Sequence, residues 1–146
     1  MIAEILFIGT ELLVGQIANT DAQYISRRLA ELGVNLYRHT TVGDNPARVK
    51  EALGEAIARA DIVITTGGLG PTEDDLTKEM VAEFFGLPME MHAPSLEALT
   101  ERMNRLGREI TPNNYKQAMM PRGAIVMPNL RGTAPGAIVE SGQKAV

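Results

Sequence analysis

Apolar runs alternate with amphipathic stretches along the first part of the chain. The run from Ala3 to Gly9 is apolar apart from Glu4, as expected for a central strand that is covered on both faces. The segment Val34 to Val42 predicts a second strand, and the β-branched segment Asp61 to Thr66 predicts a third. Because a helical pattern follows each strand, this order predicts right-handed crossovers and a parallel sheet with helices on both faces.

The helical patterns carry recognisable start and stop residues. The first helix begins at Asn19, a common capping residue, and ends at Gly33, which supplies the left-handed residue that often follows a helix. The second helix opens at Asn45-Pro46, with proline at its first position. The third ends at Gly86. The chain is therefore expected to form a three-layer, doubly wound α/β domain with a mainly parallel sheet.

The loops that leave the three strands are expected to share one edge of the sheet. In open parallel sheets, ligands bind beyond the carboxyl ends of the strands. This rule brings together the segments Gly9 to Gly15, Val42 to Asn45 and Thr66 to Asp75. We call these three segments the rim.

The segments after Pro88 are shorter and less regular. The last turn, at Ser141-Gly142, leads into a strand that starts at Lys144 and has no finish. We expect one domain over residues 1–146, truncated at its C-terminus. The other elements expected here are a helix carrying Leu96 to Leu106, a short helix opened by Thr111-Pro112, and strands at Ala124 to Met127 and Ala137 to Glu140.

Composition and charge exclude several classes of protein. The formal charge of −4 arises from acids and bases mixed along the chain, without the basic face that nucleic acid binding needs. No apolar run approaches the ~20 residues that span a bilayer. The absence of cysteine excludes disulfides, and two separated histidines argue against a histidine-rich metal site. We expect a cytoplasmic protein with a small-molecule ligand, in which any metal is bound by oxygen ligands.

The rim segment Thr66 to Asp75 carries the strongest chemical signal. Its three glycines, Gly67, Gly68 and Gly70, let backbone N–H groups approach an anion closely, which is typical of phosphate binding. Three acids follow, at positions 73–75, and would repel a phosphate unless a divalent cation intervened. Alternatively, Asp74 or Asp75 caps the third helix, which we expect for one of the two.

The other two rim segments add polar groups to the same edge. Thr10 and Glu11 follow the first strand, and Asn19 lies shortly after them. Glu11 is interpreted equally well as a ligand of a ribose hydroxyl or a metal, or as a solvated loop acid. Asp44 follows the second strand and could join this cluster, although Gly-Asp-Asn-Pro is also an ordinary turn and helix start.

Two later segments hold further candidates. Asn114 and Lys116 concentrate an amide and a cation in one short helix, where capping and solvation are the alternative roles. Gly132 and Thr133 lie in a small, turn-forming segment suited to close approach by a ligand. We interpret the charged face that includes Arg102 and Arg105, with Glu97 and Glu101, as solvated charge with helical pairing.

Taken together, these motifs closely resemble the N-terminal domain of the CinA (competence/damage-inducible protein) family. The resemblance spans nearly the whole chain in order and spacing. It rests on Gly9 to Leu13, Gly15 to Ile17, Asn19-Thr20, Val42 to Asp44, Thr66 to Asp75, Asn113 to Ala118 and Gly132 to Gly136.

The resemblance implies a fold, an activity and partners. The fold is that of the molybdopterin-binding domain, in which Asp75 and Asp44 line a pterin-phosphate site. The activity is metal-dependent hydrolysis of ADP-ribose to AMP and ribose 5-phosphate. Family members form homodimers and often continue into a C-terminal nicotinamide-mononucleotide deamidase domain, and their Pro-Gly-Pro-Pro segment is missing here.

Our leading hypothesis is therefore an ADP-ribose pyrophosphatase. The glycine loop and Lys116 would hold the diphosphate, while Mg²⁺, Mn²⁺ or Co²⁺ on Asp44, Asp75 and Glu11 would activate a water molecule. Two alternatives stay open. The same rim could bind a molybdopterin-like or nucleotide ligand without converting it, or the domain could serve mainly as an oligomerisation unit for the deamidase.

Overall fold

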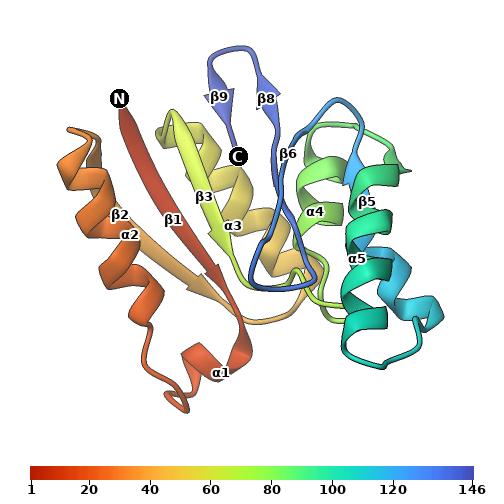
Figure 1. Ribbon diagram of the computed structural model, residues 1–146. Helices are drawn as coiled ribbons and strands as arrows, with labels where there is room; N and C mark the ends of the chain where they lie inside the picture. The colour runs from red at the N-terminus through yellow and green to blue at the C-terminus, as the bar shows by residue number, and fades with distance from the viewer.

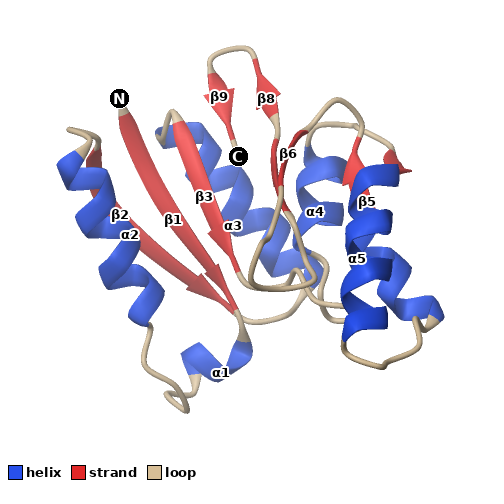
Figure 2. Cartoon of the chain, viewed as in Figure 1, coloured by secondary structure: helices blue, strands red, loops and turns tan.

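The computed structural model describes every residue from Met1 to Val146 (Figures 1 and 2). Its strands are β1 (Ile2–Ile8), β2 (Asn35–Val42), β3 (Ile62–Thr66), β4 (Met89–Met91), β5 (Met119–Pro121), β6 (Ile125–Met127), β7 (Gly136–Ile138), β8 (Glu140–Ser141) and β9 (Lys144–Ala145). Its helices are α1 (Thr10–Leu13), α2 (Thr20–Glu31), α3 (Pro46–Arg59), α4 (Thr77–Phe84), α5 (Ala93–Arg105) and the 3-10 helix η1 (Pro112–Ala118). None of these helices is long and apolar enough to cross a membrane.

The main sheet has five strands in the order β2-β1-β3-β9-β8. Strand β1 pairs in parallel with both β2 and β3, and only the terminal β8 runs antiparallel to its neighbour. Two small antiparallel pairs, β4-β5 and β6-β7, lie outside this sheet. The predicted α/β class and mainly parallel sheet are confirmed. The three-residue strands β4 and β5 and the one-turn helix α1 were not predicted, because elements so short carry no measurable periodicity.

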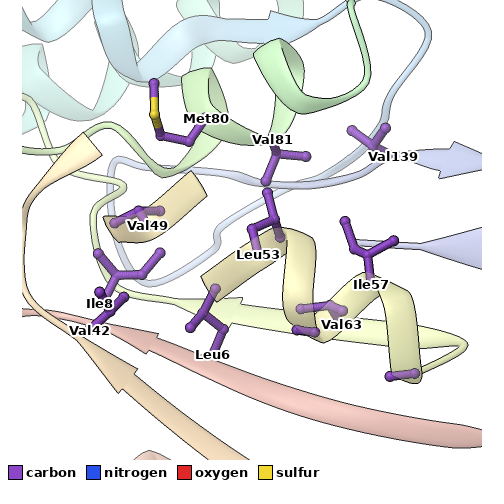
Figure 3. Close-up of a cluster of buried hydrophobic side chains, with 12 residues drawn as sticks. Leu6, Ile8, Val42, Val49, Leu53, Ile57, Val63, Met80, Val81 and Val139 are labelled. Atoms are coloured by element: carbon purple, nitrogen blue, oxygen red, sulfur yellow. The ribbon is translucent and has the colours of Figure 1, made fainter. Parts of the chain in front are cut away.

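The apolar core has two parts, one on each face of the main sheet, because successive side chains of β1 point to opposite faces. Leu6 and Ile8 join the larger apolar cluster, which α3 and α4 complete (Figure 3). Ile5 and Phe7 pack on the other face against α2, where Leu29 is buried. Helices therefore cover both faces of the parallel strands, as the continuous apolar run of β1 predicts (Figure 1).

The predicted helix signals lie where the sequence places them. Asn19 Oδ1 accepts a hydrogen bond from the N–H of Ala22, and Asn45 Oδ1 caps α3 in the same way, with Pro46 at the first turn. Gly33 and Gly86 follow α2 and α4 with φ of +69° and +66°. The asparagine caps fix where α2 and α3 begin, and the glycines fix where α2 and α4 end.

Glu4 is the one charged residue inside β1, and it is 2% exposed. Arg59, in the last turn of α3, donates to both of its carboxylate oxygens at 2.8 Å, and the Thr40 hydroxyl donates to Oε1 at 2.8 Å. The Arg59 hydrogen bonds lower the pKa of Glu4 below its usual 4.5, while burial opposes this effect and the Thr40 hydroxyl adds to it. The pair fastens the C-terminal end of α3 to the central strand.

Replacing Glu4 by glutamine should lower the free energy of unfolding at pH 7 by about 2–3 kcal/mol, since Arg59 loses its buried partner. Because the folded-state pKa of Glu4 lies below 4.5, the carboxylate's contribution is complete above pH 4.5. This contribution is lost as the pH falls through the folded-state pKa. The difference in the free energy of unfolding between wild type and Glu4→Gln should therefore disappear in that pH range. Urea unfolding across this pH range measures the difference.

Glu55→Gln is the matched control, because Glu55 is exposed and lies 3.4 Å from the same arginine. We expect this change to cost no more than about 0.5 kcal/mol at any pH. An equal loss in the two variants, or a Glu4→Gln loss that persists unchanged in acid, would show that the buried ion pair does not stabilise the fold.

Candidate ligand-binding site

The first two rim segments are joined by hydrogen bonds between Thr10 and Asp44. The N–H and the hydroxyl of Thr10 both donate to Asp44 Oδ2 at 2.8 Å, and the N–H of Gly9 donates to the Val42 carbonyl at 2.9 Å. The prediction that these loops share one edge of the sheet is confirmed. Asp44 is thereby a fixed acceptor at the carboxyl ends of β1 and β2.

The glycine loop, residues 66–75, packs directly on this edge. Gly67 has φ of +95°, and a Cβ atom there would lie 1.9 Å from the carbonyl oxygen of Ile8. Gly68 has φ of +64°, and a Cβ atom there would lie 2.2 Å from the hydroxyl of Thr77. That hydroxyl donates to the Gly67 carbonyl at 2.7 Å, and the Thr77 N–H donates to the Gly68 carbonyl at 3.1 Å. The loop is clamped between the end of β1 and the start of α4.

The glycine loop is held through its carbonyl groups, and some of its backbone N–H groups remain without a partner. The N–H groups of Gly68 and Leu69 donate to no acceptor within the chain. Successive free N–H groups in a glycine-rich turn form a concave, electropositive surface that binds anions. The geometry therefore agrees with the phosphate-binding role predicted for this loop.

The Asp75 side chain accepts hydrogen bonds from residues of its own loop. Its Oδ2 accepts hydrogen bonds from the Thr72 N–H at 2.9 Å and from the Thr72 hydroxyl. Burial raises the pKa of Asp75, but hydrogen bonds from Thr72 and from the Gly70 N–H, together with the positive charge of Lys116, hold that pKa below its usual value. A Cβ atom on Gly70 would lie 2.5 Å from this oxygen, so a side chain there would displace the carboxylate. Asp75 remains ionised and shapes the loop.

Two lysines attach the C-terminal segment to the loop. Lys116 Nζ donates to the Thr72 carbonyl at 2.8 Å. Lys78 is buried in the first turn of α4, and its Nζ donates to the Gln117 carbonyl at 2.9 Å. Burial, with the nearby charge of Lys116, lowers the pKa of Lys78 to about 8, while Glu79 opposes the shift. The lysines thus hold η1 against α4 and the glycine loop from both sides.

Lys78 and Thr77 were missed as site residues because the helical pattern drew attention only to the apolar face of α4. Both are nearly fully buried, although lysine and threonine are usually exposed. The available signal was their position directly after the acids that end the glycine loop. Their partners, the loop carbonyls and η1, are set by the tertiary fold and carry no local pattern.

The three carboxylates predicted to bind a metal do not come together. No group of three or more His, Asp or Glu side chains in this chain is placed to hold a metal ion. Asp44 bonds to Thr10, Asp75 bonds to Thr72, and the Glu11 carboxylate lies against Gly9, where a Cβ atom would be 2.5 Å from it. Asp44, Asp75 and Glu11 therefore do not form a three-carboxylate metal centre, and we assign no step to a metal.

The roles of the two neighbouring aspartates also differ from expectation. Neither caps α4, because its N-cap residue is Leu76 and no side chain accepts a hydrogen bond there. Asp74, rather than Asp75, shares a small cleft of about 10 Å³ with Asp44. Turn geometry within the loop directs the two side chains to different places, which a run of acids in the sequence does not reveal.

The other predicted ligand residues have structural partners. Asn19 caps α2, and Asn114 Oδ1 accepts hydrogen bonds from the N–H and hydroxyl of Thr111. The Gly132 N–H donates to Asn129 Oδ1, and the Thr133 hydroxyl accepts from Gln117 Nε2 at 3.0 Å. Gly132 and Thr133 line a separate cavity beside α5, away from the glycine loop. The structure thus divides the predicted site into a rim and a second hollow.

The sequence matches, over residues 4–146, the family described as the probable molybdopterin binding domain. It is 57% identical over 144 residues to a CinA-like protein of Dictyoglomus turgidum, a match that covers 99% of this chain and 35% of that protein. A CinA-like protein of Kosmotoga olearia is 54% identical over 144 residues, with the same coverage. The chain thus spans 35% of the length of these relatives.

Solved structures agree with these matches. CinA from Thermoplasma acidophilum, a protein of unknown function, superposes with a TM-score of 0.89 and 32% identity over 99% of this chain and 84% of that one. The tungsten cofactor synthesizing protein MoaB from Pyrococcus furiosus gives a TM-score of 0.57 and 19% identity over 99% and 77% of the two chains. The resemblance to CinA is confirmed, and MoaB shows the shared fold.

The prediction that this domain is an ADP-ribose pyrophosphatase is wrong. The matching family is described as a binding domain, and the CinA relatives carry no name that points to such a hydrolase. At the rim, the three carboxylates that were to hold the metal are not gathered into one group, and Asp44 and Asp75 accept hydrogen bonds from Thr10 and Thr72 instead. Of the hypotheses from sequence, the binding module fits these findings better.

Replacing Gly67 by alanine should lower the free energy of unfolding by about 3 kcal/mol or more, because the new Cβ atom would collide with the Ile8 carbonyl at an unfavourable φ. Gly86→Ala is the matched control. Its φ is also positive, but nothing lies within 4 Å of the added carbon, so we expect a loss of about 1 kcal/mol. Urea unfolding compares the two, and equal losses would contradict the close packing of the loop on β1.

Proposed function

This chain belongs to the family described as the probable molybdopterin binding domain, and we propose that it binds a phosphate-bearing small molecule at the glycine loop without converting it. The ligand class is a pterin phosphate or a nucleotide. The free N–H groups of Gly68 and Leu69 carry this proposal, since they are two adjacent donors in a glycine-rich loop that is fixed through its Gly67 and Gly68 carbonyls. An anion is the natural partner of such donors.

Lys116 brings one positive charge to the same loop. The ammonium group of Lys116 donates a hydrogen bond to the Thr72 carbonyl of the glycine loop. The carboxylate of Glu79 lies 3.9 Å from the same ammonium group. Thr72, Lys116 and Asp75 form one hydrogen-bonded unit, so the ammonium group is held near the loop in advance of binding. We propose that the phosphate binds between Lys116 and the free N–H groups.

The remaining rim residues are proposed to contact the rest of the ligand. Thr10 and Asp44 are fixed against one another at the ends of β1 and β2, and Glu11 is exposed beside them. A carboxylate at this place suits the hydroxyl or amino groups of a sugar or a pterin ring. Homodimer formation, a deamidase domain in a longer chain and a divalent cation stay predictions from the resemblance.

Titration with AMP tests the proposal. Lys116→Gln should weaken AMP binding about tenfold, because one charge-assisted contact to the phosphate is lost. Arg28→Gln is the control, since it removes the same charge from an exposed ion pair near the end of α2 that is remote from the rim. Isothermal titration calorimetry measures both affinities, and chromatography of the recovered ligand shows whether AMP is unchanged.

Adenosine, which lacks the phosphate, should bind much more weakly than AMP. The proposal fails if AMP does not bind, if adenosine binds equally well, or if Lys116→Gln and Arg28→Gln reduce the affinity by the same factor.

A further inference from the structure

A positively charged cavity lies outside the rim. This cavity of about 320 Å³ is formed between α5 and the loop of residues 128–135. None of the glycine-loop residues and neither Thr10 nor Asp44 lines it. Its volume is within the range of small-molecule sites. We call it the α5 cavity.

Two arginines give this cavity its charge. Arg102 and Arg105 lie three residues apart on α5, so both side chains are on the same side of the helix, and both line the cavity. The predicted pairing with Glu97 and Glu101 is wrong, since neither arginine makes an ion pair, and Arg105 reaches only the Glu101 backbone carbonyl at 3.5 Å. No carboxylate lines the cavity.

Arg102 is held in place by the opposite wall. Its guanidinium donates to the carbonyls of Leu130 and Arg131. That wall is itself rigid, because Asn129 accepts from the N–H groups of Arg131 and Gly132 and donates to the Ala134 carbonyl at 2.9 Å. The Arg102 charge is therefore preorganised at the cavity.

His92 also lines the cavity, at the N-terminal end of α5. Its Nδ1 accepts a hydrogen bond from the Ser95 N–H at 3.3 Å as the N-cap of α5. A neutral imidazole whose Nδ1 is an acceptor carries its proton on Nε2. His92 and Ser95 both line the cavity, so polar groups are present at one end of α5 and the arginines at the other.

The rest of the lining combines apolar surfaces with polar residues, among them Asn129 and Thr133. Pro94, Leu99 and Pro128 contribute surfaces with no charge and little rotamer freedom. Basic residues are common at the C-terminal end of a helix, because they interact favourably with the helix dipole. This effect explains why arginines occur at the end of α5, but it does not explain why they line a cavity without carboxylates. Two arginines one turn apart match a dianion, and a phosphate monoester carries a charge of about −1.5 to −2 near neutral pH.

We propose that the α5 cavity is a second binding site, separate from the rim, for a ring-bearing phosphate monoester. The phosphate is bound by Arg102 and Arg105, since guanidinium groups match phosphate oxygens in a bidentate manner. The ring lies on Pro94, Leu99 and Pro128. This site goes beyond the proposed function and does not depend on the glycine loop.

Phenyl phosphate is the probe, followed by NMR of the arginine Nε–Hε groups and of the backbone amides. In the wild-type chain, the Nε–Hε resonances of Arg102 and Arg105 should shift as phenyl phosphate is added, and the shifts should reach a plateau. Arg105→Gln should weaken this binding about tenfold or more. Its fold should be retained, because Arg105 makes only the long contact to Glu101 within its own helix.

Arg108→Gln is the matched control, because Arg108 follows the same helix but does not line the cavity. It should leave the affinity within twofold, and so should Lys116→Gln at the rim. Phenol should not bind, and inorganic phosphate should bind more weakly than phenyl phosphate.

The proposal is overturned if Arg105→Gln binds phenyl phosphate as wild type does, if only the Gly68 and Leu69 amides respond, or if inorganic phosphate binds equally well. A failure of AMP to bind at the rim would leave these results unaffected, so the two sites are tested separately.

Discussion

The contact between Gly67 and the carbonyl oxygen of Ile8 determines where the glycine loop leaves the sheet. With room for no Cβ atom, the backbone of the loop rests on the end of the most buried strand, and Thr77 then fixes the next two carbonyls. This packing uses the Gly67 and Gly68 carbonyls as acceptors, while the N–H groups of Gly68 and Leu69 make no hydrogen bond within the chain. A binding surface for an anion is thus a consequence of how the loop is packed.

The same packing explains why a segment far along the chain belongs to the site. Lys78 begins α4 directly after the loop and reaches η1 through the Gln117 carbonyl, while Lys116 returns from η1 to the Thr72 carbonyl. Gln117 in turn donates to Thr133, beside the α5 cavity. One chain of hydrogen bonds therefore connects the rim, η1 and the second hollow. Asp75 belongs to it as the internal acceptor that shapes the loop.

Local patterns predicted the parts of the fold that local physics controls. The apolar run of β1, the Asn19 and Asn45 caps and the glycine that ends α2 all have causes within a few residues of themselves. The position of the rim also followed, because the strand-end rule needs only the order of strands and helices.

The partners of individual side chains could not be predicted in the same way. Asp44, Asp75 and Glu11 are near one another in an expected topology, but Asp44 accepts from Thr10 of the neighbouring loop, Asp75 accepts from Thr72 of its own loop, and Glu11 lies against Gly9. Arg102 looked like a solvated helix residue because its partners, the carbonyls of Leu130 and Arg131, are remote in sequence. The hydrolase assignment rested on acids expected to meet at one edge of the sheet, with ADP-ribose taken from the resemblance, and the rim does not gather these carboxylates into one group.

The central claim is that the N–H groups of Gly68 and Leu69 receive a phosphate. The most direct test is a titration of the ¹⁵N-labelled chain with AMP, followed through the backbone amide resonances. We predict that the amide protons of Gly68 and Leu69 shift downfield with the largest amplitudes and with a single shared affinity. Saturable binding of AMP that leaves these two resonances in place would contradict the account.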